Sequence, residues 1–109
     1  MSRLHVFLAA IVCILSLFIC APLIADQAKA IPDYPADEVA PGVFVIHGPL
    51  GVPSVENRGF INNPAFVVGE TGVVLIDPGS SLQIGEMVLR QIRKVTDLPV
   101  VAVFNTHIH

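Results

Sequence analysis

The chain has 109 residues, which is enough for one domain at most. Beyond residue 30 it carries eight Asp and Glu residues against four Lys and Arg residues, an acidic balance that gives no electrostatic footprint for nucleic acid. Both cysteines, Cys13 and Cys20, precede residue 30, so no disulfide framework is available to the remainder of the chain.

The first thirty residues have the organisation of an export leader. A basic start is followed by a run from Leu4 to Cys20 without a charged residue. The tripeptide Ala-Lys-Ala at residues 28–30 matches the small-residue pattern that signal peptidase accepts, which predicts a signal peptide over residues 1–30. Because the apolar run continues to Ala25 and approaches the roughly 20 residues that span a bilayer, an uncleaved membrane anchor is the alternative. In both cases we expect the rest of the chain to be exported and to lie on the periplasmic side.

A proline-rich stretch separates this leader from the first predicted strand. Residues 31–42 contain three prolines among acidic residues, which predicts a lead-in that forms no helix and buries little surface. Residues 43–46 then predict a short strand, and His47 at its end is either a ligand or a half-exposed histidine. Residues 50–64 form a long loop rich in Gly, Pro and Asn, of the kind that often flanks a site.

A hairpin and a helix follow. Residues 65–68 and 73–76 are apolar runs joined by Gly-Glu-Thr-Gly, which predicts two strands with a tight turn. The apolar residues then change to helical spacing, which predicts a helix from about Leu82 to Thr96. Ser80 with Gln83 matches a capping box at its start, and Gly85 is interpreted as a point of close packing on the sheet.

The last strand leads into a pair of histidines. Five apolar residues, Val100–Phe104, predict a strand buried on both faces, and with the preceding strand and helix they form a βαβ unit. In such a unit Asp77 and the two histidines, His107 and His109, follow strand ends at the same edge of the sheet. Side chains alternate along extended backbone, so both imidazoles are able to converge on one ion, and imidazole suits zinc. The simpler alternatives are two partly exposed loop histidines and an ordinary turn aspartate.

Two of these stretches together resemble the metallo-β-lactamase fold hydrolases. Residues 74–79, Val-Leu-Ile-Asp-Pro-Gly, are similar to the strand-ending aspartate pattern of that family, and residues 105–109, Asn-Thr-His-Ile-His, to the start of its Asn-Thr-His-x-His-x-Asp-His motif. The resemblance covers residues 43–109 and implies an α/β fold, the amino-terminal half of an αββα sandwich. Residues 56–59, Glu-Asn-Arg-Gly, also look like exported members associated with quinoprotein dehydrogenase systems.

The resemblance implies roles for three residues. His107 and His109 would be two of the three histidines on a first zinc ion, and Asp77 a structural residue supporting the metal loop. The complete enzyme would hold one or two zinc ions, and metal-bound hydroxide would attack a carbonyl-type centre of a small-molecule substrate. Because the later ligands have no counterpart here, the chain alone would be inactive, and no residue of it is assigned as a catalytic acid or base.

A second hypothesis comes from a different functional class. The chain would be an exported or membrane-tethered interaction module that uses no metal, and its part after residue 30 would fold and be indifferent to zinc. The substrate, the number of zinc ions, the oligomeric state and the cleavage of the leader are not determined by the sequence.

Overall fold

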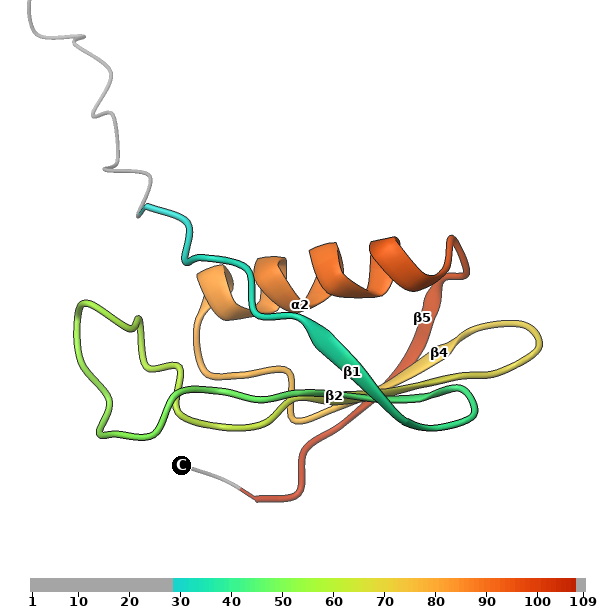
Figure 1. The fold of residues 1–109 in the computed structure, drawn as a ribbon, viewed down its shortest axis with the longest axis horizontal. Coiled ribbons are helices and arrows are strands. Elements are labelled where there is room, and N and C mark those ends of the chain that lie inside the picture. The colour runs from blue at the N-terminus through green and yellow to red at the C-terminus, as the bar shows by residue number, and fades with distance from the viewer. Residues whose placement is uncertain (1–28, 108–109) are drawn as a thin grey trace, which may run out of the picture.

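The computed structural model describes residues 29–107 (Figure 1). Nearly all of the predicted leader, residues 1–30, and the predicted ligand His109 therefore lie outside the described part of the chain. Within residues 29–107 no helix combines the length and the apolar character needed to cross a bilayer.

Across the described residues, five strands form one mixed sheet with the order β1-β2-β3-β4-β5. The elements are β1 (Ala36–Ala40), β2 (Val43–Ile46), β3 (Ala65–Val68), β4 (Val73–Ile76), α2 (Leu82–Val95) and β5 (Val100–Phe104). Strands β1 to β4 pair with one another in antiparallel fashion, whereas β4 and β5 are parallel and are joined by α2. The structure thus confirms the predicted α/β class, the β3–β4 hairpin and the βαβ unit.

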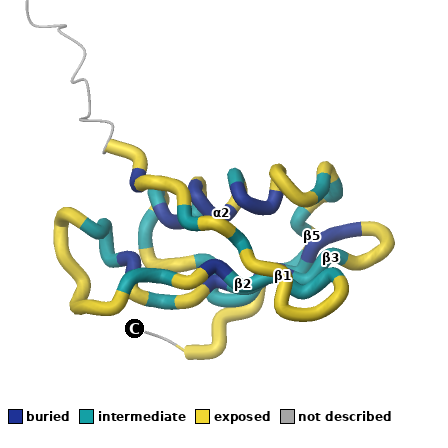
Figure 2. Tube along the Cα trace, in the orientation of Figure 1, coloured by how far each residue is buried: buried dark blue, intermediate teal, exposed yellow. Residues whose placement is uncertain are grey.

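Helix α2 lies across one face of the sheet and forms the core with it (Figure 1). Its buried apolar residues recur at helical spacing, and the dark segments of α2 in Figure 2 mark its buried positions. The apolar core consists of Ile31, Ile46, Phe60, Phe66, Val73, Leu75, Ile84, Met87, Val88 and Ile92. Each fully buried aliphatic side chain of this kind contributes about 1.5–3 kcal/mol, so the core holds α2 and the strand ends in fixed positions.

The start of α2 differs from the predicted capping box by one residue. Ser81, in an extended conformation, is the N-cap, and its hydroxyl accepts a hydrogen bond from the Ile84 N–H at 3.4 Å. Ser80 instead donates to the carbonyl of Gly59 at 3.4 Å. The interpretation of Gly85 as a close-packing point is also wrong, because a Cβ there would meet open space.

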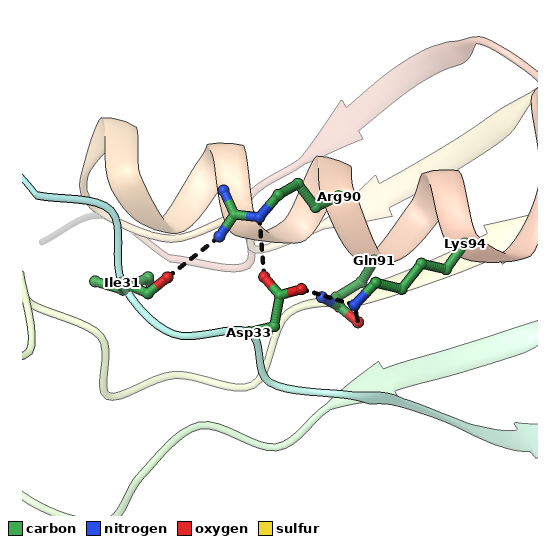
Figure 3. Close-up of polar contacts among 5 residues, drawn as sticks. All are labelled: Ile31, Asp33, Arg90, Gln91 and Lys94. Atoms are coloured by element: carbon green, nitrogen blue, oxygen red, sulfur yellow. Dashed lines mark hydrogen bonds and ion pairs between the residues drawn. The ribbon is translucent and has the colours of Figure 1, made fainter.

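The proline-rich lead-in is more ordered than its composition predicts. Its second half forms β1, which pairs with β2, and Ile31 is a core residue. Asp33 bonds two basic side chains of α2: Arg90 donates from Nε at 2.9 Å, and Lys94 from Nζ at 2.7 Å (Figure 3). The hydrogen bonds from Lys94 and Arg90 lower the pKa of the Asp33 carboxyl from 3.8 to about 2. Residues 31–34, here named the strap, are therefore fixed to α2 by contacts that proline content does not reveal.

Strand β5 is not buried on both faces, contrary to the prediction. The exposed fractions of Val101, Val103 and Phe104 are 61%, 53% and 60%. The reason is position, because β5 is the edge strand and pairs only with β4 within the described residues.

Candidate functional site

A pocket of about 480 Å³ opens where β4 and β5 end. Three loops supply its walls: the loop between β2 and β3, the loop between β4 and α2, and the segment after β5. The lining residues are Pro53, Gly59, Ile61, Asn62, Asp77, Gly79, Ser80, Asn105 and His107. Because the carboxyl ends of parallel strands meet at one edge of a sheet, residues far apart in the chain come together here.

Asp77 links the end of β4 to the segment after β5. Its backbone has a φ of 48°, a left-handed conformation that is uncommon outside glycine, and its N–H donates to the carbonyl of Phe104 at 2.8 Å. Its carboxylate accepts two hydrogen bonds from Thr106: Oδ1 from the backbone N–H at 2.7 Å, and Oδ2 from the hydroxyl at 2.6 Å. The structure therefore brings Asp77 and the histidine segment to the same edge of the sheet, as the βαβ topology predicts.

The hydrogen bonds around Thr106 determine where protons lie on His107. The Thr106 hydroxyl has one proton, which it donates to Asp77, since an ionised carboxylate only accepts. The same oxygen lies 2.7 Å from Nδ1 of His107, so Nδ1 must carry the hydrogen of that contact. In the neutral imidazole Nε2 then bears the lone pair, which is the form that binds a metal through Nε2.

Asn57 organises the long loop between β2 and β3. Its side-chain oxygen accepts from the N–H groups of Ser54 at 2.8 Å and Gly59 at 2.9 Å, and its Nδ2 donates to the carbonyl of Val52 at 2.9 Å. Three side-chain bonds from one residue give this loop a defined shape rather than a solvated coil.

The charged residues beside Asn57 act within the loop. The Glu56 carboxyl has a lowered pKa, first because of its own backbone N–H, then because of the Ser54 hydroxyl and the charge of Arg58. Arg58 has a left-handed φ of 54°. Neither charged residue lines the pocket.

The long loop is also attached to the pocket edge. Phe60 is a core residue and anchors its inner end. Next to it, the Ser80 hydroxyl donates to the Gly59 carbonyl, and Nδ2 of Asn62 donates to the Asp77 carbonyl at 2.8 Å. The sequence pattern did not predict a role for Asn62, and it contains Thr106 only as part of the Asn-Thr-His-Ile-His motif. The signal that was present is the polar Asn-Asn pair at residues 62–63 immediately before a strand.

Of the other two histidines singled out in the sequence, one lies away from the pocket and one lies outside the described residues. His47 lies with its Nε2 at 3.7 Å from the Asp37 carboxylate, both side chains being exposed, and it does not line the pocket. His109 falls outside residues 29–107, so its role as a ligand stays a prediction.

The donor set for a metal is incomplete in the part of the chain that the structure describes. Across residues 29–107, no three His, Cys, Asp or Glu side chains gather closely enough to hold an ion. His107 fits zinc as a single imidazole ligand whose tautomer is set by its neighbour, whereas a catalytic zinc usually takes three protein ligands. The carboxylate of Asp77 bonds Thr106 and therefore acts on the loop geometry.

Comparison with known protein families gives a match over slightly less than half of the chain, in the part that contains Asp77 and the histidine segment. Residues 57–109 match the model of the metallo-beta-lactamase superfamily. The matched stretch includes Asp77, Thr106, His107 and His109. The sheet and the one helix described in residues 29–107 are consistent with the amino-terminal half of a sandwich of that superfamily. No curated protein matches the chain.

Proposed function

We propose that the chain is the amino-terminal part of an exported zinc-dependent hydrolase of the metallo-β-lactamase superfamily. The superfamily match suggests a metal-dependent hydrolase-type fold, and the observation that carries the proposal is the hydrogen-bond series from Asp77 through Thr106 to His107. A histidine whose Nδ1 is held in this way presents Nε2 as a ligand, and metal-binding histidines typically have such a partner.

His107 and His109 supply two imidazoles to the proposed centre. Asp77 holds Thr106, and Thr106 holds the His107 ring in its metal-binding tautomer. Zinc, when bound, would supply Lewis-acid activation of water at neutral pH. The apolar walls at Pro53 and Ile61 would receive a small-molecule substrate and limit its contact with water.

Two imidazoles do not complete a catalytic zinc site, so the chain by itself is proposed to bind zinc weakly and to be inactive. The remaining ligands would come from a following segment that continues the motif with one residue and then Asp-His. Export rests on the leader, residues 1–30, with a periplasmic location if it is cleaved and a membrane-anchored one if it is not.

Calorimetric zinc titration of the full chain tests the proposal. We expect weak binding that is lost in His107→Gln and in His109→Gln. His47→Gln is the matched control, because that histidine pairs with Asp37 away from the pocket, and it should bind as the wild type does. Absence of zinc binding, or equal loss in all three variants, would contradict the proposal.

The same titration separates the second candidate, a metal-free interaction module. The exposed apolar side chains of β5 are the observation that favours it. Cooperative unfolding together with no response to zinc is the result it predicts.

A further inference from the structure

Asn62 is the side chain through which the long loop reaches the aspartate at the end of β4. Its Nδ2 donates to the Asp77 backbone carbonyl at 2.8 Å, and the contact is partly buried. Two residues earlier the Phe60 ring is buried and packs edge-on against Tyr34, with ring centroids 4.8 Å apart. Asn62 therefore projects from a firmly anchored part of the loop rather than from a free tip.

Asp77 needs such an anchor because its own conformation is unfavourable. With φ at 48° the residue is in the left-handed region, which persists in a non-glycine residue when surrounding contacts hold it. Its N–H is held by the Phe104 carbonyl, and its carbonyl is held by Asn62. The bond from Asn62 thus fixes the peptide that follows Asp77 and helps to direct its carboxylate toward Thr106.

We propose that Asn62 is a positioning residue that sets the tautomer of His107 through Asp77 and Thr106. When the Asn62 bond is present, the carboxylate takes the Thr106 hydroxyl proton, and the Thr106 oxygen accepts from Nδ1 of His107. When it is absent, Asp77 relaxes, and the Thr106 hydroxyl becomes able to donate to Nδ1 instead. The consequence for zinc affinity rests on the proposed function, whereas the effect on the tautomer does not.

The chain provides a matched control in the adjacent residue. Asn63 also makes a side-chain bond in this loop, but its oxygen accepts from the N–H of Gly48 at 3.0 Å, toward β2. Both residues lie in the same loop, yet only the bond of Asn62 leads to Asp77. A variant at Asn63 therefore reports what general loosening of the loop does to the histidine.

The test is the tautomer of His107, measured without zinc by long-range proton–nitrogen correlation of the ¹⁵N-labelled full chain at alkaline pH. Detergent is present because the first thirty residues are strongly apolar, and a His107→Gln variant identifies the signal. We expect mainly the Nδ1–H form in the wild type and in Asn63→Ala. In Asn62→Ala the ratio of Nδ1–H to Nε2–H should fall by about fivefold, the scale of losing one hydrogen bond. Thr106→Val should shift the ratio at least as far.

Two results would overturn the inference: an unchanged ratio in Asn62→Ala, or an equal change in Asn63→Ala. If Asn62→Ala fails to fold, Asn62→Asp replaces it, because that side chain keeps the size of asparagine but has no amide to donate. Zinc titration is performed separately, so that a shifted tautomer without zinc binding would count against the proposed function and not against the role of Asn62.

Discussion

Two aspartates hold distant parts of this chain together, and they do so by different means. Asp33 in the strap forms ion pairs with Arg90 and Lys94, two long cationic side chains on the surface of α2 (Figure 3). The Asp77 carboxylate accepts two hydrogen bonds from Thr106, one from its backbone N–H and one from its hydroxyl. Ion pairs between partly exposed side chains fasten a segment without fixing the direction of any proton, and solvent screens them. The short hydrogen bonds from Thr106 to Asp77 instead fix the segment after β5 and the position of the Thr106 hydroxyl proton. That proton position sets the tautomer of a neighbouring histidine ligand.

The largest expected effect comes from disturbing the loop that carries Asp77. A Cβ at Gly79, where φ is +104°, would lie 2.3 Å from Cγ2 of Ile84. Gly79→Ala should lower the free energy of unfolding by about 3 kcal/mol, the sum of backbone strain and overpacking. Gly85→Ala is the control: Gly85 lies in the first turn of α2 with open space around it, and the variant should stabilise by about 0.5–1 kcal/mol. Urea unfolding measures both variants, and a neutral Gly79→Ala would contradict the packing.

Asp77→Asn is expected to reverse the direction of the hydrogen bonds that join residue 77, Thr106 and His107. The Thr106 N–H only donates, so the amide oxygen of the new side chain must face it, and the amide NH₂ then donates to the Thr106 hydroxyl oxygen. That hydroxyl proton is released to Nδ1 of His107, which should shift the ring to its Nε2–H form. The loss of a charged acceptor should also cost about 1.5 kcal/mol. Nitrogen chemical shifts of His107 measure the tautomer, and an unchanged Nδ1–H form would show that Asp77 does not set it.

Replacing Gln91, which lies on α2 beside the strap, should raise the free energy of unfolding, by a smaller amount than the changes above lower it. Its side chain is buried on α2 and its oxygen accepts from Lys94 at 3.3 Å, while Nε2 finds no hydrogen-bond acceptor among the described residues. Gln91→Met should raise the free energy of unfolding by about 1 kcal/mol, because a buried unsatisfied amide is removed. Gln83→Met, at a partly exposed position of the same helix, should change it by less than about 0.5 kcal/mol. Equal effects in thermal unfolding would argue against this account.

The smallest effect is expected for the strap, and it depends on pH. The pKa of Asp33 is lowered from 3.8 to about 2 by Lys94 and Arg90, so its contribution is present above pH 3.8 and is lost as the pH falls toward 2. The stability difference between the wild type and Asp33→Asn should therefore shrink over that interval. It should also shrink in 1 M salt, where the Debye length is about 3 Å. Lys94→Gln should change stability in the same direction, and a difference that persists at pH 2 would contradict the ion-pair description.

Local sequence pattern determined most of the secondary structure of this protein. The apolar runs at residues 43–46, 65–68, 73–76 and 100–104 form strands, and the helical spacing that follows residue 81 forms α2. These features depend on neighbours a few residues apart, so they can be read from the chain directly. The βαβ order then placed Asp77 and His107 at one edge of the sheet, where the structure also has them.

Tertiary structure decided what depends on partners far along the chain. The pairing of β1 with β2 and the ion pairs of Asp33 gave order to a segment whose prolines predicted none. The edge position of β5 left apolar side chains exposed that the sequence predicted to be buried. The bond from Asn62 to Asp77 joins residues fifteen positions apart, through a side chain to a carbonyl, and no local preference specifies such a contact. Composition and periodicity describe each segment by itself, whereas the state of the histidine depends on which donors the folded chain brings to one aspartate.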